Sequence, residues 1–214
     1  MTRNFSRYSF NFESGGTIGG VVFDDREMPD VVSPVQTHSC NIAIIEADGA
    51  IPNLDDTDAI ICMAEGMKIG VRTADCVPVV VYAPDIRAVA AIHAGWKGSL
   101  GGIVNKTLKR LMSLGAALSL AEAAFGPSIC GDCYEISTDL ADRFSDEGYY
   151  DCFVSRRHID LESVNRKQLL AAGILAERIQ PKRYCTFESV LLPSWRRSPT
   201  DRRLLTWISL TGTK

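Results

Sequence analysis

Histidine is scarce in this 214-residue chain, which contains only His38, His93 and His158. Long apolar runs are missing too: no stretch approaches the ~18 residues of a membrane span, and residues 1–16 lack the hydrophobic segment of a signal peptide. The net charge of −3 provides no basic field for nucleic acid. We therefore expect a cytoplasmic protein that binds neither a membrane nor nucleic acid.

The sequence also has no internal repeats, low-complexity segments or interdomain linkers, and its glycines do not match a dinucleotide-binding fingerprint. Its composition, 46% hydrophobic and 23% charged, is that of an ordinary globular protein. A chain of this length buries ~70–75% of its unfolded surface, which suffices for a core without disulfide or metal cross-links. Residues 1–214 are therefore predicted to form a single domain, in which any metal ion serves function rather than stability.

The chain has seven cysteines, an odd number that favours reduced thiols in a reducing compartment. Cys130 and Cys133 have the spacing found in metal and redox sites. No second pair with this spacing exists to complete a structural zinc site. We interpret these two cysteines as thiols on a loop beside the functional site.

The most informative stretch runs from Val71 to Lys97. Residues 77–81 form a mostly β-branched run, Pro84 and Asp85 indicate a turn, and residues 88–92 form a second apolar run, so a β-hairpin is predicted. A turn centred on Pro84 and Asp85 places Cys76 directly opposite His93. Opposed residues have Cβ atoms ~4.5–5.5 Å apart, which is close enough for both to bind one metal ion.

The alternative interpretation of this pair is a buried free cysteine beside a core histidine. The flanking residues argue against it, because Arg72, Asp75 and Lys97 are polar and unlike a core. His38 is expected on a loop that enters a strand at residues 41–46, and His158 is expected to make a structural hydrogen bond.

Helices are predicted from periodicity and caps. Residues 100–112 present one apolar face, with Gly115 as the C-terminal cap, and Asp160 caps a second helix at residues 161–172. The segment 93–98 is thus a strand-to-helix junction, where Lys97 could bind an anion. The arginines at 196, 197, 202 and 203 form either a solvated surface or a second place for an anionic group.

Six motifs follow one another along most of the chain: QTHSC at 36–40, RTADCVPV at 72–79, HAGWKG at 93–98, GPSIC and CYEI within 126–136, HIDLESVNRKQL at 158–169, and CT with SWRR within 185–197. Together they closely resemble the YfiH family, once described as polyphenol oxidases or laccases and now as purine nucleoside phosphorylases. The sequence departs from the family pattern in three places: Lys97 where arginine is usual, a different loop around Cys130, and a tail without the usual Arg-Arg-Asp-Gly. These departures bear on substrate preference more than on the metal site.

The resemblance implies an α/β/α sandwich with a mixed sheet and helices on both faces. It also implies that His38, Cys76 and His93 bind zinc at the base of a pocket. Three protein ligands and a vacant fourth position are typical of a catalytic zinc site. Copper could occupy the same site, but three histidines cannot build the several copper centres of a multicopper oxidase.

The activity implied by the resemblance is phosphorolysis of adenosine, inosine, guanosine or methylthioadenosine to the base and ribose 1-phosphate, with adenosine deamination as a second reaction. Cys76, His93 and Asp75 are then the expected catalytic residues, Asp75 orienting a ligand or taking a proton. Arg72 and Lys97 are expected to hold phosphate. The partners are a purine nucleoside and phosphate, and a monomer is favoured.

Two alternatives remain open. The first is a metal-independent cysteine amidase that edits peptidoglycan precursors, with Cys76 as nucleophile and His93 as its base. A thiol alkylator would abolish such an activity and a chelator would spare it. The second is a non-catalytic protein that binds a partner through this site.

Overall fold

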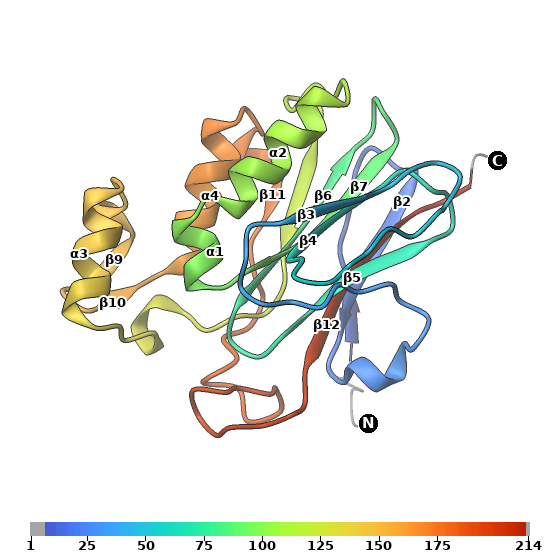
Figure 1. Cartoon of the computed structure of the whole chain (residues 1–214). Coiled ribbons are helices and arrows are strands. Elements are labelled where there is room, and N and C mark those ends of the chain that lie inside the picture. Colours follow the sequence, from blue (N-terminus) through green and yellow to red (C-terminus); the bar gives the residue numbers. More distant parts are fainter. Residues whose placement is uncertain (1–6, 213–214) are drawn as a thin grey trace.

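The computed structural model describes residues 7–212 and shows three stacked layers (Figure 1). Helices α1, α2 and α4 cover one face of a central mixed sheet, and a smaller antiparallel sheet packs against the other face. One apolar cluster fills the space between helices and sheet, and a second fills the space between the two sheets. None of the helices formed by residues 7–212 is long and apolar enough to span a membrane.

The central sheet has the strand order β11-β8-β6-β7-β4-β3 in the described residues. The pairs β3/β4 and β8/β11 are parallel and the other pairs are antiparallel, which confirms the predicted α/β class with a mixed sheet. Its strands are β3 (Ile42–Ile45), β4 (Ala59–Cys62), β6 (Val77–Ala83), β7 (Ala88–Ala94), β8 (Glu122–Phe125) and β11 (Ile179–Gln180).

Strands β6 and β7 form the predicted hairpin, but the predicted register is wrong. The loop comprises residues 84–87, with Arg87 at a positive φ of 48°, so Ala83 pairs with Ala88 and Pro78 pairs with His93. The four-residue loop moves the pairing by two residues from the prediction. Because side chains alternate with a period of two, Cys76 keeps its predicted face and lies diagonally across from His93.

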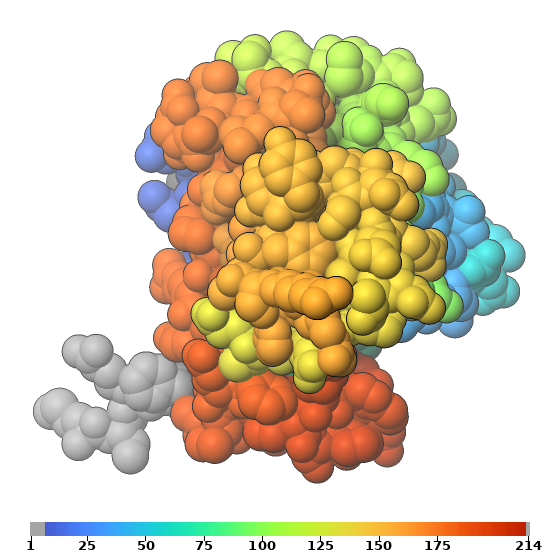
Figure 2. All heavy atoms as spheres, turned by 90° about the vertical axis from the view of Figure 1, so that its left-hand side faces the viewer, coloured from blue at the N-terminus to red at the C-terminus, as the bar shows by residue number. Residues whose placement is uncertain are grey.

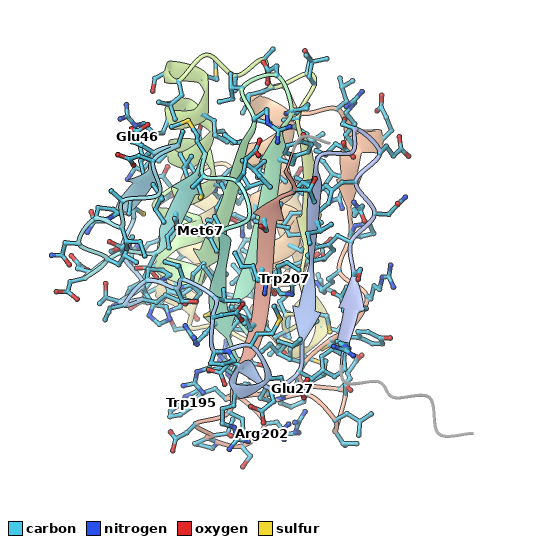
Figure 3. All side chains as sticks on the ribbon, turned by 90° about the vertical axis from the view of Figure 1, so that its right-hand side faces the viewer. Glu27, Glu46, Met67, Trp195, Arg202 and Trp207 are labelled. Carbon is cyan, nitrogen blue, oxygen red and sulfur yellow. The ribbon has the colours of Figure 1, made fainter. Side chains whose placement is uncertain are left out.

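The second sheet has the order β1-β2-β12-β5 in the described residues and consists of β1 (Arg7–Ser9), β2 (Thr17–Val22), β5 (Lys68–Thr73) and β12 (Leu204–Leu210). It takes the place of the helices that were expected on this face. Figure 3 shows β12 between β2 and β5, with Trp207 at its middle. Trp207 pairs with Gly20 on one side and Gly70 on the other. A Cβ atom at Gly20 would overlap the Tyr8 carbonyl oxygen, so the close approach of β1 requires glycine there.

The helices are α1 (Trp96–Leu100), α2 (Ile103–Ser113), α3 (Thr138–Asp146) and α4 (Leu161–Ala171). Asp160 caps α4 as predicted, its side chain accepting a hydrogen bond from the Glu162 N–H. Ser137 caps α3 in the same way through the Leu140 N–H. Figure 2 shows α2 and α4 side by side on one face of the molecule, with the segment around α3 next to them.

The remaining short elements connect these layers. They are the pair β9 (Phe153–Ser155) and β10 (His158–Ile159) and the 3₁₀ turns Asp25–Glu27, Gly131–Cys133, Tyr150–Cys152 and Ala176–Arg178. Residues 181–203, between β11 and β12, form a long loop that we call the C-terminal loop. It lies at the end of the sheets where β6 begins and β7 ends (Figure 1). The candidate functional site lies beneath this loop, which contributes Trp195, Arg196 and Arg203 to its lining.

Candidate metal and active site

Three side chains predicted as ligands come together at this end of the central sheet. His93 is near the end of β7, Cys76 directly precedes β6, and His38 lies on the loop before β3. One donor atom of each residue lies within 4.8 Å of the others. The sulfur of Cys76 is 3.7 Å from Nε2 of His38, and the two imidazole rings meet edge to face.

A buried carboxylate holds both histidines in place. Asp58, immediately before β4, is 0% exposed, and its Oδ1 lies 2.6 Å from Nδ1 of His93. The same carboxylate accepts backbone N–H bonds from Thr37, His38 and Ser39, at 2.7 to 3.1 Å. Asp58 therefore fixes the backbone that carries His38 and leaves Nε2 of His93 free to bind a metal ion.

The backbone around the site is shaped to bring these groups close. His38 has a positive φ of 64°, a conformation that few residues other than glycine adopt. Gly95 follows β7, where a Cβ atom would lie 2.7 Å from Cδ2 of His38 and 3.1 Å from the Cys76 sulfur. A side chain at position 95 would therefore displace a ligand.

Neighbouring groups set the charge states of these ligands. Burial raises the pKa of the Cys76 thiol, but hydrogen bonds and charge from His38 and His93 outweigh burial and lower it to about 6. Burial lowers the pKa of His93, but Asp58 and Cys76 outweigh it and raise it to about 9. For Asp58, the hydrogen bonds from His93 and Ser39 overcome burial and hold the pKa of its carboxyl well below the usual range.

The donor set fits zinc. In tetrahedral zinc sites the metal–sulfur and metal–nitrogen distances are ~2.3 and ~2.0–2.1 Å, so neighbouring ligand atoms lie roughly 3.5–3.8 Å apart. The separation of 3.7 Å between Cys76 and His38 matches this value. The contact between His93 and Asp58 is the carboxylate–histidine support that such ligands commonly have.

A cavity of about 580 Å³ opens above the three ligands. Arginines and the aromatic side chains of Trp96, Tyr134 and Trp195 line it together, with Arg196 over the Tyr134 ring and Arg203 over the Trp195 ring. The complete lining is Pro34, Gln36, His38, Arg72, Thr73, Ala74, Asp75, Cys76, His93, Trp96, Tyr134, Trp195, Arg196 and Arg203. Guanidinium groups suit an anion, and aromatic faces suit a planar base.

Asp75 lines the cavity but uses both carboxylate oxygens to anchor the C-terminal loop. Its Oδ1 accepts from Oγ1 of Thr186 at 2.6 Å, and its Oδ2 accepts from the N–H of Arg196 at 2.7 Å. The residue is buried and has a positive φ of 89°. These contacts position the loop that closes one side of the cavity.

The basic residues separate into different groups. Arg72 reaches the cavity wall and pairs with Asp25 at 2.9 Å, and Arg203 reaches the wall from the C-terminal loop. The Arg203 guanidinium also donates to the backbone carbonyls of residues 200 and 202. The Arg197 guanidinium donates to the backbone carbonyls of residues 186, 187, 189 and 192, which stiffens that loop. Lys97 lines a neighbouring open cavity of about 490 Å³ and lies over the Trp96 ring.

His158, the third histidine, lies outside this site. Its Nδ1 is 3.0 Å from Oγ of Ser155, which confirms the expected structural hydrogen bond. The sequence analysis did not assign Asp58, Tyr134 or Trp195 to the site. The signal for Asp58 was an acidic residue directly before a fully apolar strand, because a carboxylate buried at such a position must be paired.

The structure is thus an α/β fold in which two histidines and a cysteine, able to hold a metal ion and here called the His₂Cys centre, lie under a cavity lined by arginines and aromatic side chains. Residues 22–211 match the family model described as multi-copper polyphenol oxidoreductase laccase. The chain therefore belongs to this laccase-like family, which includes the YfiH proteins. The match confirms the resemblance that the sequence motifs indicated.

Named relatives and a solved structure agree with this assignment. The chain is 36% identical over 174 residues to adenosine deaminase RL5 from an unknown prokaryotic organism, covering 75% of this chain and 66% of that protein. It is 35% identical over 173 residues to a purine nucleoside phosphorylase from Bacteroides thetaiotaomicron, covering 74% and 64%. The chain thus spans less than two thirds of either relative. The crystal structure of YlmD from Geobacillus stearothermophilus has the same fold, with a TM-score of 0.85, 22% identity, and coverage of 99% and 98%.

Proposed function

We propose that this protein is a zinc-dependent purine nucleoside phosphorylase, acting on adenosine, inosine, guanosine or methylthioadenosine, with adenosine deamination as a second activity. The names of its relatives support both reactions. A reducing, cytoplasmic location, in which thiolate ligands persist, is part of the proposal.

The observation that carries the proposal is the position of the ligand group. The donor atoms of His38, Cys76 and His93 lie within 4.8 Å of one another at the base of a cavity of about 580 Å³. That volume is within the usual range for sites that enclose a small molecule. The cavity wall combines features that suit each part of a nucleoside and a phosphate.

Each group of wall residues has its own task in phosphorolysis. Arg72 and Arg203 neutralise and orient the phosphate, an oxygen of which forms a bond to C1′ as the bond between C1′ and the base nitrogen breaks. Tyr134 and Trp195, whose rings also lie against Arg196 and Arg203, hold the base by stacking. Asp75 positions the loop that carries Arg203 and Trp195.

His38, Cys76 and His93 hold the metal ion in this scheme, and Asp58 orients both histidines. When bound, zinc supplies Lewis acidity at the base of the cavity, which both reactions can use. Deamination replaces the C6 amino group of adenosine by an oxygen from water and releases ammonia. It therefore requires no phosphate, which separates the two activities experimentally.

The proposal is tested by product analysis with one preparation of the full chain. Adenosine, inosine, guanosine and methylthioadenosine are each incubated with and without phosphate, and base, ribose 1-phosphate and ammonia are measured. We expect phosphate-dependent release of base in equal amounts with ribose 1-phosphate. Ammonia without phosphate dependence would assign deamination as the main activity, and no turnover of any of the four nucleosides would refute the proposal.

One feature favours a second candidate, the cysteine amidase. The low pKa of Cys76, near 6, makes a thiolate beside a histidine that a carboxylate orients, which is also how cysteine nucleophiles are activated. The two candidates respond differently to reagents. A chelator that removes activity supports the metal-dependent reaction, whereas activity that survives chelation but not alkylation of Cys76 supports the amidase.

A further inference from the structure

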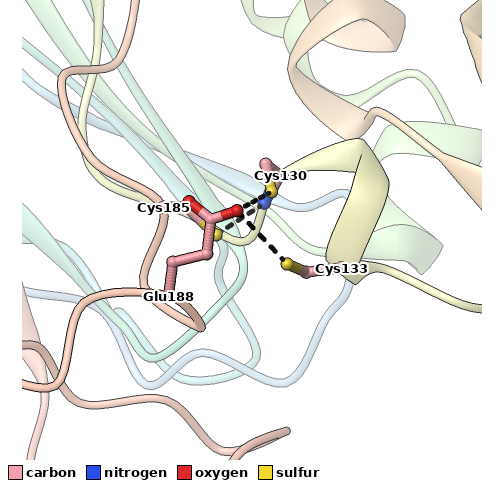
Figure 4. Close-up of side chains that lie close together, drawn as sticks. All are labelled: Cys130, Cys133, Cys185 and Glu188. Atoms are coloured by element: carbon pink, nitrogen blue, oxygen red, sulfur yellow. Dashed lines mark hydrogen bonds between the residues drawn. The ribbon is translucent and has the colours of Figure 1, made fainter.

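A second group of metal-binding side chains lies outside the His₂Cys centre. The sulfur atoms of Cys130, Cys133 and Cys185 and a carboxylate oxygen of Glu188 all lie within 4.8 Å of one another. Figure 4 shows the four side chains converging from two loops. Oε1 of Glu188 is 3.7 Å from the sulfur of Cys130 and 3.7 Å from that of Cys133.

The backbone holds this group in a form that suits thiolate ligands. Cys130 to Cys133 form a tight turn in which the Cys133 N–H donates to the Cys130 carbonyl at 3.1 Å. The Cys130 N–H donates to the sulfur of Cys185 at 3.3 Å. A backbone N–H that points at sulfur stabilises negative charge on that sulfur, as a metal-bound thiolate requires.

The group lacks a positive partner among the described residues. No ion pair formed by residues 7–212 includes Glu188, and the polar contacts of its carboxylate are with two thiols. The hydrogen bonds of the Arg197 guanidinium go to backbone carbonyls of the same loop, including those of residues 187 and 189 on either side of Glu188. A bound cation would supply the charge that the carboxylate lacks.

We propose that Cys130, Cys133, Cys185 and Glu188 form a second, structural zinc site. Three sulfur ligands and one carboxylate oxygen complete a tetrahedral shell with protein atoms alone, as closed structural sites do. Binding converts the three thiols to thiolates and releases their three protons to solvent, and no electron is transferred. The four ligands then carry four negative charges against the two positive charges of the ion.

The geometry favours one bound metal ion over a disulfide between two of the cysteines. All seven cysteines, which lie within the described residues, are free thiols, and the distances of 3.7 Å to Glu188 are close to the roughly 3.5 Å expected between a sulfur and an oxygen on one tetrahedral zinc ion. A disulfide would join two of the sulfurs at ~2.05 Å and leave the third thiol and Glu188 without a common partner.

The site joins two walls of the cavity. Tyr134, which follows Cys133, lines the cavity, and the Ile129 N–H donates to the Asp75 carbonyl at 3.0 Å. Thr186, which follows Cys185, donates to the Asp75 carboxylate. The second ion would therefore hold together the two loops that meet at Asp75, next to Cys76. The ion would in this way fix the loops that carry Tyr134 and Trp195 in the cavity wall, rather than stabilise the core.

The first test measures the zinc content of the full chain. The protein is purified in the presence of reductant and zinc, and excess metal is then removed. We expect two zinc ions per chain in the wild type, one in Cys76→Ser and one in Cys133→Ser. Cobalt bound to the Cys76→Ser variant should show strong thiolate-to-metal absorption. Adding Glu188→Gln should leave this absorption in place, because the three thiolates remain. It should weaken the affinity for the metal by more than the ~10–100-fold typical of losing a supporting residue. One zinc in the wild type and none in Cys76→Ser would overturn the proposal.

A second test needs no variant, so misfolding of Cys133→Ser cannot obscure the result. The wild-type chain is alkylated with and without a chelator, and each modified cysteine is identified by mass spectrometry. Zinc should protect Cys130, Cys133 and Cys185 together, whereas the half-buried Cys40, outside both groups, should react equally in both states. Equal labelling of the three cysteines in both states, or a disulfide between two of them in the zinc-treated protein, would contradict the site. Neither test uses nucleoside turnover, so its outcome is independent of the proposed reaction.

Discussion

Nδ1 of His93 lies 2.6 Å from Oδ1 of Asp58, and both side chains are almost fully buried. This contact decides which nitrogen of His93 faces Cys76 and the cavity, because Asp58 holds Nδ1 and leaves Nε2 to point toward them. The same carboxylate also accepts the backbone N–H of His38. One residue that does not face the cavity thus arranges two of the three ligands.

The change Asp58→Asn should weaken zinc binding by ~10–100-fold, because the amide cannot accept all the hydrogen bonds that orient the histidines. Competition with a chromophoric chelator measures the affinity. Asp55→Asn, which changes an exposed carboxylate on the same loop, is the control. Equal affinities for the two variants would show that Asp58 does not support the site.

The change Cys76→Ala should remove zinc from the His₂Cys centre and abolish phosphorolysis together, because only two protein ligands remain. Zinc content and release of base are measured on the same sample. Cys40→Ala, at a half-buried thiol outside the group, should retain both. A Cys76→Ala enzyme with wild-type turnover would rule out a metal site that depends on this thiolate.

The change Gly95→Ala should lower zinc affinity although position 95 supplies no ligand. The added methyl group would stand 2.7 Å from the His38 ring and 3.1 Å from the Cys76 sulfur, so one of them must move. Gly212→Ala, where the new Cβ meets its nearest neighbour at 3.7 Å, is a matched control. The comparison requires only a zinc titration, and unchanged affinity in Gly95→Ala would show that the ligands are placed differently.

Removal of a guanidinium from the cavity should raise the KM for phosphate more than the KM for the nucleoside. Arg203→Met is expected to raise the KM for phosphate at least ~10-fold, the value of one charge-assisted hydrogen bond. Lys97→Met should have a smaller effect, because Lys97 lines the neighbouring cavity. Lys109→Met, on the exposed face of α2, serves as the control. A larger effect from Lys97 than from Arg203 would restore the assignment predicted from the sequence.

The change Asp75→Asn should loosen the C-terminal loop and leave the metal in place, because the carboxylate anchors Thr186 and Arg196 and is not among the three ligands. Limited proteolysis between residues 185 and 203 should become faster, while zinc content stays unchanged. If kcat falls with no change in proteolysis, Asp75 acts on the substrate directly.

The sequence predicted the α/β class with a mixed sheet, and it predicted that Cys76 and His93 lie close together. Spacing identified Cys76 and His93 as a pair even though the hairpin register is shifted by two residues, because a shift of two keeps side chains on the same face. The run of apolar residues in β6 and β7 predicted buried strands, but it could not show whether helices or a second sheet cover them.

Long-range contacts account for what the sequence analysis missed. Asp58 reaches His38 and His93 over 20 and 35 residues, and no local pattern records such a contact. Cys185 joins Cys130 over 55 residues, so the pair at 130 and 133 was interpreted without its partners. Local periodicity and caps, by contrast, located α2 and α4.

The most direct test of the central claim relates turnover to occupancy of the His₂Cys centre. Zinc is added stepwise to the chelated full chain, and each sample is assayed for phosphate-dependent release of base and for protection of Cys76 from alkylation. We predict that the rate rises in proportion to the protected fraction of Cys76 and reaches its maximum when that fraction is complete. Full activity in the chelated protein, with Cys76 unprotected, would contradict the account.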